Sequence, residues 1–330
     1  MTLKKIVAVF ILCISTLTAL GQSELQIQNI GNLITTANDT IKDCKIGYRT
    51  FGNLNKDKTN VVFMPTWHLG TSENNLDYLK SIIDTKGQYL VVVDALGNGV
   101  SSSPSNYSDF PNISIRDMVN SQYELLVNHL KIEHVELLVG VSMGGMQAFE
   151  WMVGYPEFMK ELIVINGTTK SSFYDKVLWN TAVTLIEDAG NDKELLDYAM
   201  NRISDIGLLV STSPTQVTKA YENEDFQEVV SARYNQPNNP FNKLIQSRAI
   251  LEHNIYKDGK ISLDNIAEFV KAKTFIIIAE QDHIVNPIYS EELSKILDCD
   301  IFVLKGDCGH IAAFCDVELV KQAVSEFLKK

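Results

Sequence analysis

The chain has 330 residues, and 29 Lys and Arg against 41 Asp and Glu give it a formal net charge of −12. Hydrophobic residues make up 45% and charged residues 21%, which is the composition of a globular protein and excludes a disordered or collagen-like chain. The length allows one large α/β domain or two medium ones. The acidic balance argues against binding to nucleic acid and to anionic membranes.

The first 21 residues have the pattern of a secretory signal peptide. Lys4 and Lys5 precede an apolar run over residues 6–19, and Ala19-Leu20-Gly21 has small residues at the spacing that signal peptidase reads. A transmembrane anchor is the alternative, but the run is shorter than the roughly 20 residues that a spanning helix needs. We therefore expect residues 1–21 to be removed near Gly21, the protein to be exported (periplasmic or secreted), and the mature chain to have no membrane span.

Four cysteines remain beyond this signal. The spacing of Cys44, Cys299, Cys308 and Cys315 fits no zinc pattern and is too sparse for a disulfide scaffold. An oxidising compartment would permit one bridge, for which Cys308 and Cys315 are the nearest pair in sequence. The pattern favours small buried thiols over that bridge.

Beyond residue 24, short β-rich runs alternate with amphipathic stretches, as in a parallel sheet covered by helices. We expect an antiparallel opening portion within residues 41–51. The predicted buried strands follow at residues 60–64, 89–93, 135–139, 161–165, 275–278 and 301–304. Helices are predicted from the Ser114 cap to Leu130, and over residues 288–297 and 317–328.

A long segment between the fourth and fifth of these strands has a different character. Residues 169–268 have helical periodicity and no clear strand. Because strands of the same type resume afterwards, we interpret the segment as a cap over the sheet edge at which α/β folds bind ligands, rather than as an independent helical domain. The mature chain then divides into an α/β core of residues 22–168 and 269–330 and a helical cap of residues 169–268.

Gly140-Val141-Ser142-Met143-Gly144 directly follows the strand at 135–139 and precedes a helix. This is the context of the G-x-S-x-G elbow, in which a sharp strand-to-helix turn exposes the serine oxygen above the sheet. The two glycines relieve crowding in that turn, and the N-terminus of the next helix favours developing negative charge. The pattern favours Ser142 as a nucleophile over a simple glycine-rich turn.

A serine nucleophile needs a base, and the base needs an orienting carboxylate. With this elbow the partners follow in the order Ser, Asp, His. Asp282 lies after the strand at 275–278, and His310 lies after the strand at 301–304. Both side chains can therefore reach the sheet edge that carries Ser142. Glu280 and Asp307 are rival carboxylates.

An oxyanion hole needs two N–H donors aimed at the same point. The backbone amide of Met143 is one predicted donor. The other is expected from the turn after the strand at 60–64, Pro65-Thr66-Trp67-His68-Leu69-Gly70, with the Trp67 amide as first choice and Thr66 next. His68 either lines the pocket or is an ordinary surface loop residue.

Three stretches carry a resemblance to a known family. The elbow and its helix, Gly140-Val-Ser-Met-Gly-Gly-Met-Gln-Ala-Phe-Glu-Trp151 followed by Tyr155-Pro156, resemble homoserine O-acetyltransferases, a branch of the α/β-hydrolase superfamily. Tyr48-Arg-Thr-Phe-Gly-Asn-Leu-Asn55 with Asn60-Val-Val is similar to the N-terminal signature of that family, and Gly309-His310 with Ala313-Phe314 to its histidine loop.

This resemblance covers residues 40–168 and 270–328. It implies an α/β-hydrolase fold, with a mostly parallel sheet flanked by helices and a helical cap inserted after the fourth parallel strand. It also implies Ser142 as the acyl-accepting nucleophile, with Asp282 and His310 as its partners.

Some features depart from that family. Its transferases use acetyl-CoA and bind the amino-acid carboxylate with an arginine, but Arg202, Arg233 and Arg248 of the cap stand in no matching motif. The turn at 65–70 and the loop at 94–103 also differ from the family's pattern. An exported copy would moreover have no acetyl-CoA, because that donor is cytoplasmic.

These observations predict an exported serine hydrolase that cleaves a small carboxylic ester or similar acyl compound, without cofactor or metal. O-acyl transfer from acetyl-CoA is the alternative function, and a non-catalytic binding protein on the same fold is the third. The sequence has no metal cluster or phosphate-binding loop, and Gly97-Asn98-Gly99 lacks the third glycine and the helix start of a dinucleotide site.

Overall fold

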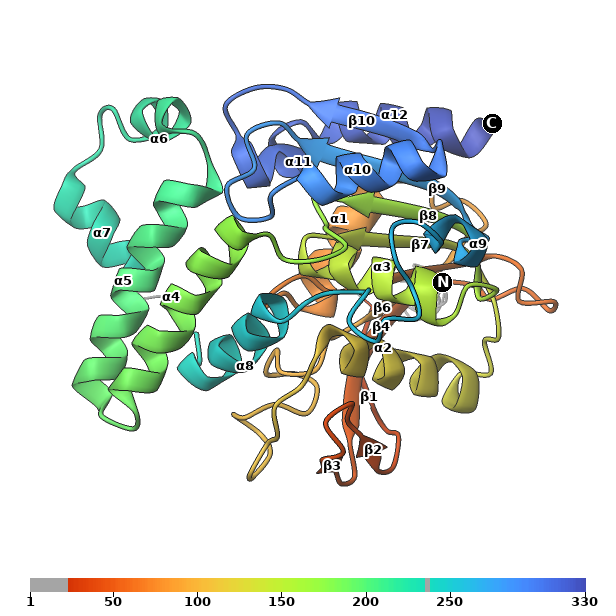
Figure 1. Cartoon of the computed structure of the whole chain (residues 1–330), viewed down its shortest axis with the longest axis horizontal. Coiled ribbons are helices and arrows are strands. Elements are labelled where there is room, and N and C mark those ends of the chain that lie inside the picture. Colours follow the sequence, from red (N-terminus) through yellow and green to blue (C-terminus); the bar gives the residue numbers. More distant parts are fainter. Residues whose placement is uncertain (1–22, 235–237) are drawn as a thin grey trace, which may run out of the picture.

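The computed structural model describes residues 23–234 and 238–330, so the predicted signal peptide lies outside the described residues. Its centre is an eight-stranded sheet of order β1-β4-β6-β5-β7-β8-β9-β10 (Figure 1). These strands are β1 (Gln26–Asn29), β4 (Lys45–Gly52), β5 (Val61–Pro65), β6 (Tyr89–Val93), β7 (Val135–Val141), β8 (Met159–Ile165), β9 (Lys273–Ala279) and β10 (Asp300–Leu304). In this order, neighbouring strands from β6 to β10 run parallel, whereas β4 pairs antiparallel with both β1 and β6. The strands β2 (Leu33–Ile34) and β3 (Thr40–Ile41) form a separate small sheet. The expected parallel sheet with an antiparallel opening is confirmed.

The central strands are buried on both faces, which explains their continuous apolar sequences. In β5, Val61 and Phe63 belong to one hydrophobic core, and Val62 and Met64 belong to the other. Successive side chains of a strand point to opposite faces, so a single run supplies both cores.

Helices cover the two faces of the sheet. Residues of α1 (Ser72–Ile82) and α12 (Val317–Lys329) pack in one core. The other core is covered by α2 (Ile115–Tyr123), α3 (Met143–Gly154), α9 (Ile266–Phe269) and α10 (Ile288–Leu297). The helix predicted from Ser114 continues past α2 as a π-helical turn over Glu124–His129.

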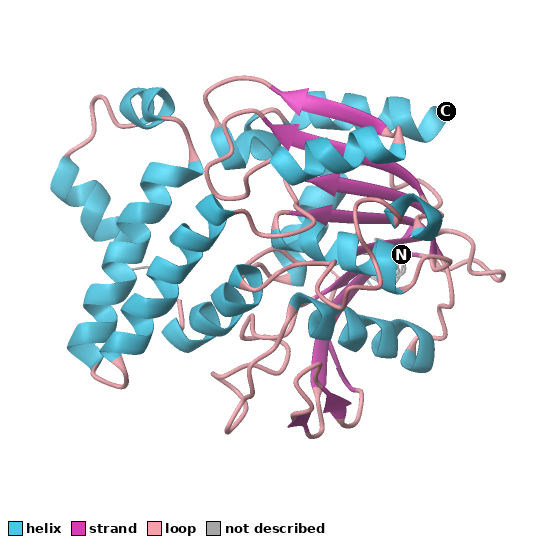
Figure 2. Ribbon diagram, in the orientation of Figure 1, coloured by secondary structure: helices cyan, strands magenta, loops and turns pink. Residues whose placement is uncertain are grey.

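Between β8 and β9, the described residues form the short α9 near the core and, before it, a group of helices in the segment predicted to be helical. This group comprises α4 (Phe173–Ala189), α5 (Lys193–Ser211), α6 (Pro214–Ala220), α7 (Phe226–Tyr234) and α8 (Pro240–Leu251). Figure 2 shows the arrowheads of β9 and β10 pointing toward the side of the sheet on which α4 and α5 lie. The inserted helices are thus beside the carboxyl ends of the strands. No helix in the described ranges is long and apolar enough to cross a bilayer.

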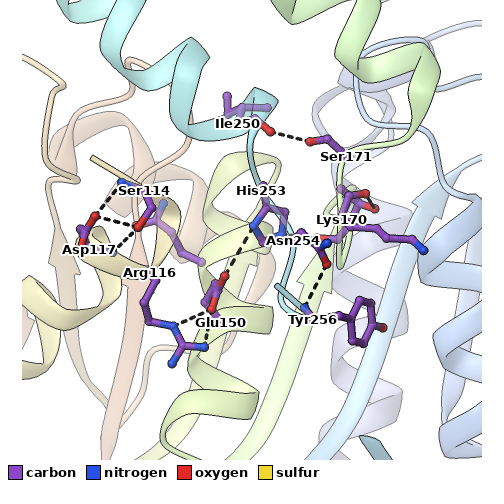
Figure 3. Close-up of polar contacts among 12 residues, drawn as sticks. Ser114, Arg116, Asp117, Glu150, Lys170, Ser171, Ile250, His253, Asn254 and Tyr256 are labelled. Carbon is purple, nitrogen blue, oxygen red and sulfur yellow. Dashed lines mark hydrogen bonds and ion pairs between the residues drawn. The ribbon is translucent and has the colours of Figure 1, made fainter. Parts of the chain in front are cut away.

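Polar contacts join one end of this inserted segment to the core and its two ends to each other (Figure 3). Glu150 of α3 accepts a hydrogen bond from Arg116 Nε at 2.6 Å and lies 3.7 Å from Nδ1 of His253, which follows α8. The Ser171 hydroxyl, just before α4, donates to the Ile250 carbonyl near the end of α8. The segment therefore leaves and re-enters the core at neighbouring points.

The structure corrects the expectation for two of the cysteines. Cys308 and Cys315 form a disulfide with a Cα–Cα distance of 6.5 Å, whereas Cys44 and Cys299 are free thiols. The expectation of free thiols is wrong for the bridged pair, because the chain folds back through a 3-10 turn and α11 (Ala312–Cys315) and brings the two residues together.

Candidate active site

Ser142 occupies the turn between β7 and α3 with an unusual backbone conformation. Its φ is 55° and its ψ is −121°, a region that non-glycine residues rarely adopt and that costs free energy of order 1–3 kcal/mol. Its N–H donates to the Ile165 carbonyl at 2.9 Å, which ties the turn to the end of β8. The neighbouring strand thus holds the strained residue in place.

The two glycines of the elbow are required by close backbone approaches. A Cβ on Gly140 would lie 2.3 Å from the Gly144 carbonyl oxygen, and a Cβ on Gly144 would lie 2.7 Å from the Pro65 carbonyl oxygen. Both distances are shorter than any side chain tolerates, and both neighbours are backbone atoms. The two glycines of G-x-S-x-G therefore follow from the tightness of the elbow itself and from its packing against the end of β5.

The structure brings the three predicted residues together. The Ser142 hydroxyl donates to His310 Nε2 at 2.9 Å, and His310 Nδ1 donates to Asp282 Oδ2 at 2.7 Å. The Asp282 side chain is 1% exposed, and its Oδ1 accepts the backbone N–H groups of Ile284 and Val285, each at 2.8 Å. The carboxylate is thereby fixed in one orientation toward the imidazole.

The rival carboxylates lie elsewhere. Glu280 is exposed, and Asp307 pairs with Lys219 at a distance of 3.4 Å. His310 has a further anchor that the sequence did not indicate, because its carbonyl oxygen accepts the Asn166 side-chain amide at 2.8 Å. Asn166 is buried and directly follows β8. A polar residue just after a predicted strand was the sequence signal that could have indicated it.

The Met143 amide is available at the elbow. Met143 is the first residue of α3, and the N–H groups of the first helical turn have no acceptor within the helix. The Met143 N–H, next to Ser142 in the chain, therefore has no acceptor within its own helix, and Met143 as an oxyanion donor stays a prediction.

The turn after β5 leaves fewer amides free. The Thr66 N–H donates to the Val93 carbonyl at 3.1 Å, and the Leu69 N–H donates to Gln246 Oε1 at 2.7 Å. The Trp67 N–H makes a longer hydrogen bond of 3.3 Å to Asn75 Oδ1. The His68 N–H has no hydrogen-bond partner in the described part of the chain. Trp67 as an oxyanion donor stays a prediction, and the His68 amide is the alternative that the geometry adds.

A cavity of about 150 Å³ lies between this turn and the inserted helices. Its walls come from α4, α5 and α8, together with the side chains of His68 and Ile284. Of the two open interpretations of His68, the structure supports the one that lines a pocket. Trp179 and Lys243, which also face this cavity, stand in no sequence motif, so nothing in the sequence singled them out. Among residues 23–234 and 238–330, no group of three or more His, Cys, Asp and Glu is placed to hold a metal ion.

Comparison with known proteins identifies the family of this fold. Residues 70–316 match the model of a family described as having the alpha/beta hydrolase fold. The chain is 29% identical to an ethyl acetate hydrolase of Pseudomonas veronii over 320 residues, covering 89% of this chain and 91% of that protein. It is 25% identical to a homoserine O-acetyltransferase of Methanococcoides burtonii, covering 88% of this chain and 70% of that protein.

Among solved structures, the monoclinic structure of the acetyl esterase MekB superposes with a TM-score of 0.83 at 27% identity, covering 93% of this chain and 96% of that chain. A homoserine O-acetyltransferase from Staphylococcus aureus gives a TM-score of 0.79 at 18% identity, which shows a shared fold. The chain therefore belongs to the α/β-hydrolase fold family, and its relatives there include both esterases and homoserine O-acetyltransferases.

Proposed function

We propose that this protein is a serine hydrolase that cleaves a short carboxylic ester through an acyl-enzyme on Ser142. The observation that carries the proposal is the continuous hydrogen-bond chain from Ser142 through His310 to Asp282. The similarity to an ethyl acetate hydrolase over most of both chains supports the ester as substrate class.

In the first half-reaction, the Ser142 oxygen attacks the ester carbonyl while His310 Nε2 accepts the hydroxyl proton. Asp282 stabilises the imidazolium that forms and keeps Nδ1 protonated. The tetrahedral oxyanion is stabilised by the Met143 amide and by a second amide from the turn after β5, either Trp67 or His68. The imidazolium then protonates the alcohol as the C–O bond breaks.

In the second half-reaction, water attacks the acyl-enzyme with His310 as general base and releases the free acid. Acyl transfer to homoserine is the competing function, because homoserine O-acetyltransferases are relatives of this chain. We favour water, because the esterase relative matches over 91% of its length and the transferase relative over 70%. The proposed export supports the same choice, since acetyl-CoA is absent outside the cytoplasm.

We further propose that residues 169–268 act as a cap over the acyl site. The support is the cavity that α4, α5 and α8 form with His68 beside the turn after β5. We also propose export after cleavage near Gly21, from the basic start and the apolar run of the sequence. N-terminal sequencing of protein from its native host should begin near Gln22, and an intact Met1 in the cytoplasm would contradict export.

The experiment is a panel of short-chain aryl and alkyl esters, run with and without acetyl-CoA and homoserine, with product identification. Hydrolysis predicts free acid as the product and a rate that homoserine does not change. O-acyl homoserine as the main product, with acetyl-CoA as donor, would establish the transferase instead. No turnover of any ester would favour a binding protein on this fold.

A further inference from the structure

Lys243 carries an amine for which the described residues provide no acidic partner. It lies in the first turn of α8, is partly buried, and forms no ion pair with any described residue. Burial lowers the pKa of its amine to about 8, so the group is mainly protonated at neutral pH. A charge taken partly out of water without a counter-ion costs free energy, which a ligand of opposite charge would recover.

The cavity that Lys243 lines has the composition of an anion subsite. His68 and Trp179 also line it, and their buried ring nitrogens, His68 Nε2 and Trp179 Nε1, have no hydrogen-bond partner within the described chain. Burial holds the pKa of His68 well below its usual range, so its ring is neutral. None of the described residues that line the cavity is acidic; the others are apolar. One cation, a neutral imidazole and an indole therefore line a small and otherwise apolar space.

This cavity is close to the reacting groups. His68 belongs to the turn after β5, and the charge of His310 is among the influences on its pKa. Ile284, which also lines the cavity, donates its N–H to Asp282 Oδ1. A volume of about 150 Å³ holds a group of roughly benzene size. A small end group of the ester would therefore fill it while the carbonyl lies at Ser142.

We infer that Lys243 recognises a carboxylate on the substrate, so that the substrate class is a short ester carrying a negative charge. This rests on the proposed ester hydrolysis. The indole of Trp179 and the neutral imidazole of His68 add no competing charge beside the lysine. A zwitterion such as an amino acid is disfavoured, because its ammonium group would find no acidic side chain in the cavity and would meet a lysine of like charge.

The test compares esters that differ only in charge. The alcohol-side series is 4-acetoxybutanoate, its uncharged isostere 4-methylpentyl acetate, and the zwitterion O-acetyl-L-homoserine. The acyl-side series is ethyl hydrogen succinate against ethyl 4-methylpentanoate. In at least one series the anionic ester should have the highest kcat/KM. In Lys243→Met, the ratio of kcat/KM for the anionic ester to that for the neutral ester should fall about 10- to 100-fold, since hydrogen bonds to charged groups have that strength.

The loss should appear mainly in KM, because the carboxylate is bound equally in the ground state and the transition state. Lys193→Met, which removes an exposed lysine at the start of α5, is the matched control and should leave the ratio unchanged. A wild-type enzyme that prefers the neutral ester in both series would overturn the inference while leaving ester hydrolysis intact.

A binding measurement makes the inference independent of turnover. Calorimetry should detect 4-acetoxybutanoate binding to Ser142→Ala, and binding should weaken about tenfold or more when Lys243→Met is added. Unchanged affinity in the double variant would overturn the carboxylate subsite even if no ester were hydrolysed. Absence of hydrolysis together with a Lys243-dependent affinity would instead refute only the proposed activity.

Discussion

Asp282→Asn changes the hydrogen-bond donors around the imidazole while preserving side-chain size. The carboxylate uses Oδ1 for the N–H groups of Ile284 and Val285 and Oδ2 for His310 Nδ1. In the variant, the amide oxygen keeps both backbone donors when its NH2 faces Nδ1. The imidazole must then accept at Nδ1 and carry its proton on Nε2, so it can no longer take the proton of Ser142.

The magnitude follows from the cost of the alternative orientation. Turning the amide over would place NH2 against two backbone N–H groups and lose two buried hydrogen bonds, each worth about 1 kcal/mol or more. The inactive tautomer is therefore preferred. For a serine triad, this change lowers kcat by about 10⁴-fold, which corresponds to about 5 kcal/mol of transition-state stabilisation.

The assay is the steady-state hydrolysis of an aryl acetate, with thermal unfolding measured to show that the fold is retained. Asp307→Asn is the matched control, because that carboxylate is also close to His310 in sequence but is only half-buried and pairs with Lys219. Asp307→Asn should leave kcat within about twofold. A folded Asp282→Asn protein that keeps kcat within tenfold, or an equal loss in Asp307→Asn, would refute the tautomer argument.

Three further predictions concern the same structure. Ser142→Ala and His310→Ala should each lower kcat by roughly 10⁴-fold or more, and the double variant should be little worse because the residues act as a unit; a phosphonate ester should label Ser142 alone, and labelling elsewhere would contradict the assignment. Replacing both Cys308 and Cys315 by Ser should lower the free energy of unfolding by about 2 kcal/mol and reduce kcat, because the bridge closes the turn around His310. Denaturation and rate measurements on the oxidised wild type and this variant check it, and equal kcat would show that the bridge does not position His310. The lowered pKa of Lys243 means that the unfolded chain binds more protons between pH 8 and 10, so the wild type should gain stability relative to Lys243→Met over that range. Parallel pH dependences in denaturant unfolding would contradict the buried charge.

The parts of the site that the sequence predicted share one physical basis. Ser142, Asp282 and His310 each follow a strand with a clear β-rich pattern, and parallel strands carry their carboxyl-end loops to one sheet edge. Local pattern and topology together therefore place all three residues. Excluding Glu280 required the structure. Glu280 and Asp282 lie two residues apart, and the sequence does not show which of the two side chains points toward His310.

The remaining parts depend on tertiary packing. Which amide of the turn after β5 is free follows from distant acceptors such as Val93 and Gln246, which no local motif contains. Lys243 and Trp179 come from helices whose mutual arrangement is set by packing, and helical periodicity does not encode it. The Cys308–Cys315 bridge likewise requires a chain reversal that cysteine spacing alone does not show.

Acid quenching during turnover of an aryl acetate, followed by peptide mass analysis, tests the proposed mechanism most directly. The account predicts one acetyl group on the peptide that contains Ser142. The rate constant for loss of this acetyl group should equal kcat, and homoserine should not change it. Acetylation of another residue, no acetyl-enzyme during rapid turnover, or a deacylation rate that rises with homoserine would contradict it.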